Sequence, residues 1–181
     1  YEASEYQVNY ANQMLGKKYV HCNSLDGIET IIENLKTDVV SLVGVLEHLQ
    51  HPDKVLSALS MNNNIKYFFF SLPLFSTGIF FELVFPHVMP RQIAGGHTHL
   101  YTESSIKHFC KQYRFEKISE WWFGMDIYDL FRNVWVTLEK SKDFQNIVPL
   151  WSSLFEPLLD DLQLAIDKRH VSSEVHMVVK N

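Results

Sequence analysis

The sequence has few cysteines, no long apolar run and no basic run. Its two cysteines, Cys22 and Cys110, lack the spacing of a metal-binding motif, so we expect buried free thiols and a reducing, cytoplasmic compartment. The longest apolar runs, such as Tyr67–Phe70, are too short to cross a bilayer, so no membrane span is predicted. A net charge of −5 without a basic run argues against nucleic acid as a partner.

The length and composition indicate one globular unit. The chain has 181 residues, of which 46% are hydrophobic and 20% charged, which suits a single domain over residues 1–181 with its own core. It begins with Tyr1 rather than an initiator methionine. We therefore expect the domain to be incomplete at its N-terminus.

The most informative stretch begins at Asp38. Residues Val39–Val43 are nearly all apolar and rich in β-branched side chains, which predicts a strand buried on both faces by helices. Gly44 follows and lets the backbone turn or approach a ligand closely. The polar pair Glu47 and His48 comes next, at the carboxyl end of the strand, where open α/β sheets bind ligands.

Helical and strand patterns alternate along the rest of the chain, which predicts an α/β fold. Capping residues and apolar spacing predict helices near residues 4–16, 26–35, 52–59, 102–110, 126–140 and 143–169. Short apolar segments predict strands near residues 18–22, 38–43, 65–72, 115–123 and 173–179.

Two segments are expected to cover a substrate. Residues 74–101 are aromatic and interrupted by glycine and proline, which favours a lid or a subunit interface, with core packing as an equal alternative. A homodimer through the Phe75–Phe85 region is one such interface. The helical residues 125–169 would cap the active-site face.

The stretch D-V-V-S-L-V-G-V-L-E-H-L-Q-H-P, residues 38–52, resembles the fourth strand of class I S-adenosylmethionine-dependent methyltransferases. The resemblance extends more weakly over most of the chain. It implies a Rossmann-like fold with a mostly parallel sheet and an antiparallel C-terminal strand. It also implies methyl transfer from the cofactor S-adenosylmethionine to a small-molecule acceptor, with the O-, N- or C-nucleophile undetermined. The glycine-rich loop of that family is missing, which implies that the first strand-helix unit is missing too.

The resemblance also implies a set of cofactor-binding residues. Glu2, just before a predicted helix, matches the acid that accepts hydrogen bonds from the ribose hydroxyls, although a glutamate beside a helix N-terminus has the same pattern. Asp26 matches an adenine contact, with a plain helix cap as the alternative. The full predicted set is Glu2, Ser24, Leu25, Asp26, Val43, Gly44, Val45 and His48.

Two histidines are the candidate catalytic residues. His97 and His99 precede a predicted helix, and either could act as a general base or contact the acceptor, because imidazole titrates near neutral pH. The alternative is that they hydrogen-bond loop backbone. Some quinone-biosynthesis O-methyltransferases bind a divalent cation at E-x-x-E-H, and Glu47 and His48 match that motif, with His97-x-His99 as a source of further ligands. Gly44 replaces the first acid, so we expect no metal.

Two other functions compete with methyl transfer. The missing glycine-rich loop also fits a non-catalytic or truncated methyltransferase-like domain that acts in binding or assembly. Another nucleotide-binding α/β enzyme, such as a dehydrogenase, would instead prefer NAD.

Overall fold

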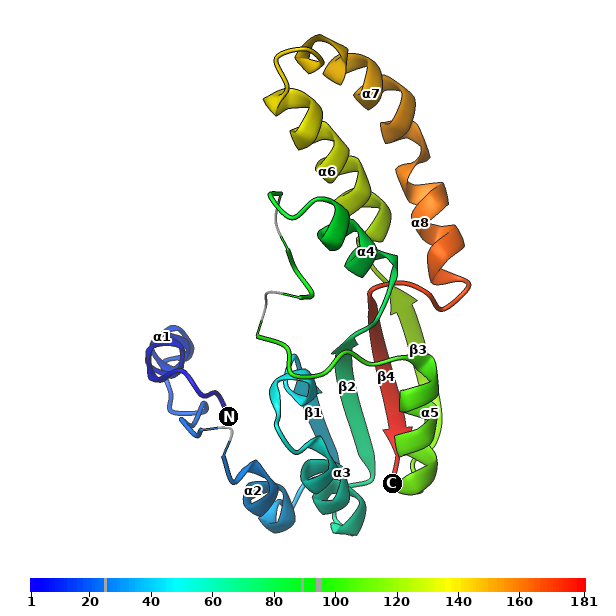
Figure 1. Cartoon of the computed structure of the whole chain (residues 1–181). Helices are drawn as coiled ribbons and strands as arrows, with labels where there is room; N and C mark the ends of the chain where they lie inside the picture. Colours follow the sequence, from blue (N-terminus) through cyan, green and yellow to red (C-terminus); the bar gives the residue numbers. More distant parts are fainter. Residues whose placement is uncertain (25, 89, 94–95) are drawn as a thin grey trace.

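The computed structural model describes residues 1–24, 26–88, 90–93 and 96–181, so Leu25 of the predicted cofactor set lies outside the described residues. Its centre is one four-stranded sheet with the order β1-β2-β4-β3 (Figure 1). The strands are β1 (Val39–Val43), β2 (Tyr67–Pro73), β3 (Glu116–Phe123) and β4 (Glu174–Lys180).

The sheet is mixed. Strands β1 and β2 run parallel, whereas β4 pairs antiparallel with both β2 and β3. The predicted α/β, Rossmann-like class and the antiparallel C-terminal strand are therefore confirmed. Three of the four strands, β1, β2 and β3, run in the same direction, and β4 lies between β2 and β3 and reverses both of those pairings.

The helices are α1 (Glu5–Leu15), α2 (Ile28–Asn34), α3 (Pro52–Met61), α4 (Thr77–Val84), α5 (Glu103–Gln112), α6 (Asp126–Lys140), α7 (Val148–Phe155) and α8 (Leu159–Asp167). Most of them begin and end close to the predicted positions, but α4 lies in a segment where no regular helix was predicted, and the stretch 143–169 is divided into α7 and α8. Short 3-10 turns occur at η1 (Leu46–His48), η2 (Gln145–Ile147) and η3 (Glu156–Leu158). No helix formed by the described residues is long and apolar enough to span a membrane.

The N-terminal region differs from the prediction in three ways. Residues 18–22 do not form a strand; Cys22 makes one isolated bridge with Glu2. The side chain of Asn12 accepts hydrogen bonds from the amides of Tyr19 and Val20, so a helix side chain satisfies the backbone there. The N-cap of α2 is Gly27 without a side-chain hydrogen bond, so Asp26 does not cap this helix. Cys22 is free but exposed rather than buried.

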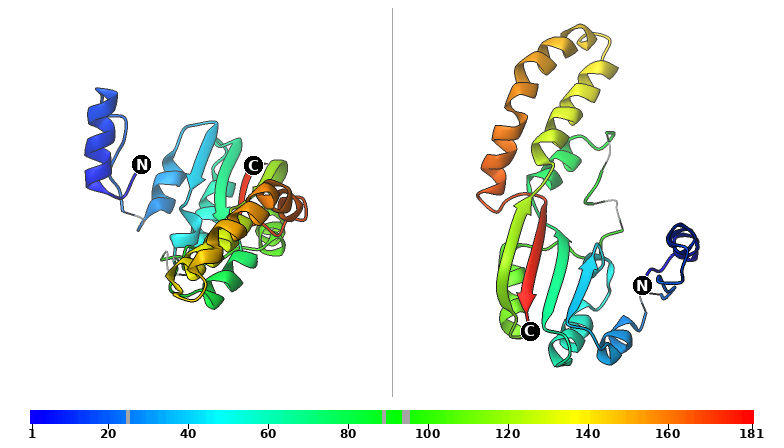
Figure 2. Two further views of the ribbon diagram at one scale, coloured as in Figure 1. Left: turned by 90° about the horizontal axis from the view of Figure 1, so that it is seen from above. Right: turned by 180° about the vertical axis from the view of Figure 1, so that it is seen from behind.

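The helices of the described residues cover one face of the sheet and leave the other face uncovered. Helices α3 and α5 pack on that face over a core that includes Leu42, Phe68 and Phe70 (Figure 1). The view from behind shows the other face without a covering helix (Figure 2). Val39 and Val43 are accordingly 54% and 60% exposed, so the prediction that β1 is buried on both faces is wrong. Exposed and buried side chains alternate along β1 because, in the described part of the chain, no element packs on the second face of the strand.

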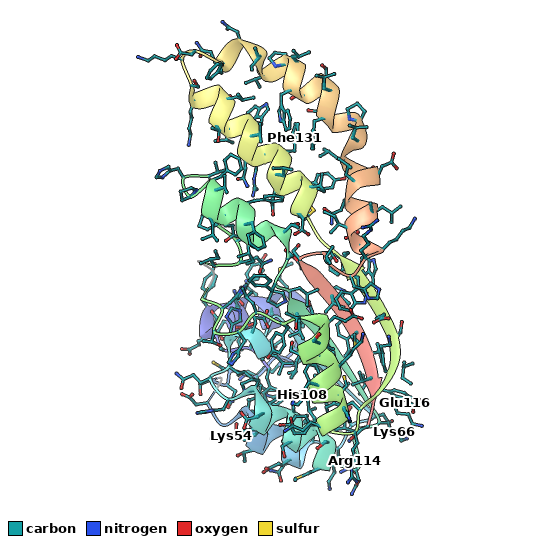
Figure 3. All side chains as sticks on the ribbon, turned by 45° about the vertical axis from the view of Figure 1, so that its right-hand side comes forward. Lys54, Lys66, His108, Arg114, Glu116 and Phe131 are labelled. Carbon is teal, nitrogen blue, oxygen red and sulfur yellow. The ribbon has the colours of Figure 1, made fainter. Side chains whose placement is uncertain are left out.

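Helices α6, α7 and α8 form an arm that extends beyond the sheet (Figure 1). Phe131 on α6 points toward the opposite helix, where its ring stacks with Trp151 at 5.9 Å between centroids (Figure 3). The buried carboxylate of Asp126 anchors the arm, accepting hydrogen bonds from the Ser76 hydroxyl at 2.6 Å and the Ser173 amide at 2.8 Å. The two predicted helical stretches in residues 125–169 are therefore confirmed, whereas their role as a lid stays a prediction.

Candidate active site

A groove of about 520 Å³ lies between the start of the chain and β1. Five predicted cofactor residues line it: Glu2, Ser24, Val43, Gly44 and Val45. They come from three separate segments, namely the first residues, the turn before α2, and the end of β1. The groove therefore brings together residues that are far apart in the sequence, at the carboxyl end of a strand.

The backbone and the side chain of Glu2 are both held in place. Its amide donates to the carbonyl of His21 at 3.0 Å, and its carbonyl accepts from the amide of Asn23 at 3.0 Å. Its carboxylate oxygen Oε1 accepts from the amide of Ser4 at 2.8 Å, just before α1. Among the described residues, the other carboxylate oxygen has no hydrogen-bond donor, so it remains available to a ligand.

Gly44 ends β1 in a left-handed conformation with φ of 63°. A side chain at this position would be strained by the backbone angle, although the nearest atom to an added Cβ would be Glu47 Oε1 at 3.7 Å. The absence of a side chain leaves the end of the strand open to the groove. A ligand can therefore approach the backbone closely at this point.

The remaining predicted cofactor residues lie elsewhere. Asp26 and His48 line a separate cavity of about 390 Å³, together with residues at the start of α2 and α3. The side chain of Ile28 lines both this cavity and the groove. Asp26 and His48 thus lie near the groove without lining it.

The segment that carries His97 and His99 crosses the carboxyl end of the sheet. The amides of Thr98 and His99 both donate to the carbonyl of Glu47, at 2.8 and 3.2 Å. The hydroxyl of Thr98 also donates to the carbonyl of Leu49 at 2.9 Å. These hydrogen bonds attach the segment to η1 and the residue after it, shortly beyond the end of β1.

His97, unlike His99, lines a small cavity of about 270 Å³ at this edge of the sheet. The lining residues are Val43, Gly44, Glu47, Ser71, Pro73, Arg91, Gln92, His97 and Glu174. His99 is not among them, and its Nδ1 lies 2.9 Å from the Thr98 hydroxyl. The structure therefore separates the two candidate catalytic histidines.

Several residues of this cavity, among them Arg91, Gln92 and Glu174, were not predicted from the sequence. Arg91 lies 3.4 Å from a carboxylate oxygen of Glu174 and 3.5 Å from one of Asp129. Burial raises the pKa of Asp129, and the charge of Arg91 partly opposes that effect. Gln92 is buried, and its side-chain oxygen has no hydrogen-bond partner among the described residues. Arg91 and Gln92 lie in an irregular segment without periodicity, so no sequence pattern marked them.

Three potential metal ligands and one buried tyrosine also lie at this edge of the sheet. Glu47, His48 and His97 each offer a metal-ligating atom, and these atoms lie within 4.8 Å of one another. Tyr101 donates its hydroxyl hydrogen to the carbonyl of Leu46 at 3.3 Å. Burial, with the charge of Glu47, raises the pKa of Tyr101, so its phenol stays protonated and does not act as a base.

Known structures share this fold. The chain superposes on a SAM-dependent methyltransferase from Archaeoglobus fulgidus with a TM-score of 0.53 and 14% identity, covering 99% of this chain and 73% of that one. A putative sarcosine dimethylglycine methyltransferase from Galdieria sulphuraria gives 0.52 and 10%, covering 98% and 66%. The cyclase SpnF gives 0.51 and 9%, covering 99% and 63%. No protein-family model and no curated protein matches the sequence.

These likenesses define the fold class. The chain has the Rossmann-like fold of class I methyltransferases, with its four strands in the order β1, β2, β4 and β3. It spans less than two thirds of the cyclase and about two thirds of the Galdieria protein. Because a cyclase shares the fold, the fold by itself does not select the reaction.

Proposed function

We propose that the chain binds S-adenosylmethionine in the groove between Glu2 and Gly44 and transfers its methyl group to a small-molecule acceptor. The observation that supports this most is the convergence of five predicted cofactor residues on one groove. The groove lies at the carboxyl end of a strand, where open α/β sheets bind ligands. Fold neighbours that depend on the same cofactor add support.

The residues of the groove suit the parts of this cofactor. A carboxylate such as Glu2 offers two acceptor oxygens to the vicinal ribose hydroxyls, and one of its oxygens is free in the described part of the chain. Ser24 lies where an adenine contact is expected, and Gly44 allows close approach of the methionine portion. The cofactor, when bound, supplies an electrophilic methyl carbon, so the protein has mainly to position the acceptor and exclude water.

The small cavity at the edge of β1 and β2 suits the acceptor. Its volume of about 270 Å³ lies just below the ~300 Å³ at which pockets for drug-sized ligands begin, so the acceptor is small. Gly44 lines both this cavity and the groove, which brings the acceptor next to the cofactor. His97 lines the cavity and His99 does not, so we propose His97 as the residue that contacts the acceptor or accepts its proton.

A thermal-shift experiment on the full chain tests this function. S-adenosylhomocysteine at saturating concentration should raise the midpoint of unfolding, because a ligand that binds only the native state stabilises it. NAD at the same concentration should not. A larger shift with NAD, or none with S-adenosylhomocysteine, would contradict the proposal.

A non-catalytic binding or assembly role is the second candidate. The sequence has no glycine-rich loop, which the fold class normally uses to hold the methionine portion of the cofactor. A homodimer through the Phe75–Phe85 region would suit such a role, and Phe75 and Phe80 are 51% and 55% exposed. Cofactor binding without methyl transfer to any tested acceptor, with a dimeric mass by light scattering, would favour this candidate.

A further inference from the structure

A further open cavity lies at the end of the sheet opposite the groove. Its volume is about 770 Å³, and it is lined by Lys66 and Tyr67 where β2 begins, by Arg114 after α5, and by Lys180 at the end of β4. The groove and the acceptor cavity instead include Gly44, at the carboxyl end of β1, which runs parallel to β2. This cavity, which we call the basal cavity, therefore belongs to neither part of the proposed site.

The basal cavity is basic although the chain as a whole is acidic. Lys66, Arg114 and Lys180 line it, and none of its described side chains is acidic. The formal net charge of the whole chain is −5. Figure 3 shows Arg114 and Lys66 at the same end of the molecule, away from the arm. Cations that gather on a surface of opposite overall charge attract anions to that place.

Two of these cations have no ion-pair partner among the described residues. Lys66 Nζ lies 2.7 Å from a carboxylate oxygen of Asp38, so the charge of Lys66 is compensated. Arg114 and Lys180 form no ion pair with any residue that the structure describes. This holds although Glu116 lies opposite Lys180 in the ladder between β3 and β4. The charges of Arg114 and Lys180 are therefore available to an anionic ligand.

Arg114 occupies a backbone position that glycine usually fills. Its φ is 61°, in the left-handed region. Its amide donates to the carbonyl of Lys111 at 3.4 Å, and the amide of Phe115 donates to the carbonyl of Cys110 at 2.9 Å. These two hydrogen bonds form a Schellman motif, in which the left-handed residue is most often glycine because a Cβ atom is strained there. A long charged side chain at this position costs stability, which favours a role for that side chain in binding.

Two tyrosines add aromatic surface and a hydrogen-bond donor to the basal cavity. Tyr67, which is 40% exposed, and Tyr113 both line it. The Tyr113 hydroxyl accepts a hydrogen bond from the side-chain amide of Gln112 at 3.3 Å, so its own hydrogen remains available to a ligand. The volume of about 770 Å³ lies within the range of ~300–1,000 Å³ that is usual for small-molecule pockets. The cavity therefore has room for a ligand larger than a single inorganic ion.

From these observations we propose that the basal cavity binds a phosphorylated small molecule through its phosphate group. Arg114 and Lys180 supply the positive charge, because guanidinium and ammonium groups form short, charge-assisted hydrogen bonds with phosphate oxygens. The rings of Tyr67 and Tyr113 contact the rest of the ligand. The site is separate from the groove and does not depend on the proposed methyl transfer.

The position of Arg114 has one other explanation. The helix dipole favours a cation near the C-terminal end of a helix, and Arg114 directly follows Tyr113, the C-cap of α5. That explanation requires no ligand and gives no role to Lys180. It therefore predicts that phosphate does not bind.

Titration calorimetry on the full chain at low salt tests the site with cytidine monophosphate, inorganic phosphate and cytidine. None of these probes contains the adenine that the groove is proposed to bind. Cytidine monophosphate should bind at one site per chain, and cytidine should not bind. Inorganic phosphate that binds as tightly as the nucleotide would identify the free ion as the ligand, and weaker binding would identify an organic phosphate. Absence of binding by both phosphates would overturn the proposal.

Two variants and one control locate the phosphate. Arg114→Gly and Lys180→Gln should each weaken binding of cytidine monophosphate at least tenfold, whereas Lys142→Gln, at an exposed position between α6 and η2, should not. Arg114→Gly should unfold at the same or a higher urea concentration than the wild type, because glycine suits the left-handed backbone, so its loss of affinity does not reflect unfolding. Unchanged affinity in both variants would overturn the site. Saturating S-adenosylhomocysteine should leave the nucleotide affinity unchanged, and competition between the two would place the nucleotide in the groove and overturn the proposal.

Discussion

Glu2 and Gly44 line the same groove, although one precedes α1 and the other ends β1. An isolated bridge pairs the backbone of Glu2 with that of Cys22. A ligand in this groove would contact the carboxylate of Glu2 on one side and the backbone of Gly44 on the other.

Replacing Glu2 with alanine should weaken binding of S-adenosylhomocysteine by about tenfold or more, because hydrogen bonds to a charged group contribute about 1.5–3 kcal/mol. Titration calorimetry on the full chain measures the change. Glu5→Ala is the matched control, since Glu5 lies on α1 outside the groove. Equal affinity of the Glu2 variant and the wild type would remove Glu2 from the site.

Replacing Gly44 with alanine should lower both stability and affinity. The left-handed backbone costs about 1 kcal/mol or more for a residue with a side chain, and the new methyl group would narrow the groove. Gly16, with φ of 64° at the end of α1 and nothing within 4 Å of an added Cβ, provides the control. Gly16→Ala should show the stability loss in chemical denaturation without the loss of affinity. A normal affinity in Gly44→Ala would show that the cofactor does not approach this position.

Replacing Asp126 with alanine should destabilise the fold by about 3 kcal/mol, because several buried donors would lose their acceptor at once. Those donors include the Ser76 hydroxyl and the amides of Gly78 and Ser173. Urea denaturation measures the loss. Asp161→Ala, at an exposed site on α8, should cost little, and similar losses in the two variants would contradict the role assigned to Asp126.

The two thiols should differ in reactivity. Burial raises the pKa of Cys110 to about 11, so its thiol stays protonated at about pH 8, whereas Cys22 is exposed. A thiol reagent should therefore modify Cys22 in a fast phase and Cys110 in a slow one. The variant Cys22→Ser should lack the fast phase. The slow reaction of Cys110 should accelerate as pH rises toward its pKa. A fast phase that survives in Cys22→Ser would contradict the assigned burial.

The sequence predicted the elements well where the signal is local. The caps at Ser4 and Gly16 and the capping residue Thr102 all lie where the pattern placed them, because a cap depends on neighbouring backbone alone. The sequence also predicted strand β1, but it wrongly predicted that both faces of this strand are buried. Whether Val39 is covered depends on which element packs on the second face of the sheet. The residues of a single strand do not show whether such an element is present.

The candidate site could be predicted only in part. Glu2 and Gly44 were found through a family resemblance, whereas Arg91 and Gln92 lie in an irregular segment where no periodicity marks a position. The cluster of Glu47 with His97 depends on hydrogen bonds between η1 and a distant segment. Contacts of this kind arise from the tertiary fold, so the sequence around one residue does not predict that the other lies beside it.

A crystal structure of the chain with S-adenosylhomocysteine would show where the cofactor binds. We expect the ribose hydroxyls within hydrogen-bond distance of the Glu2 carboxylate and the sulfur beside Gly44. A nucleoside bound elsewhere, or an empty groove in crystals grown with saturating ligand, would contradict it.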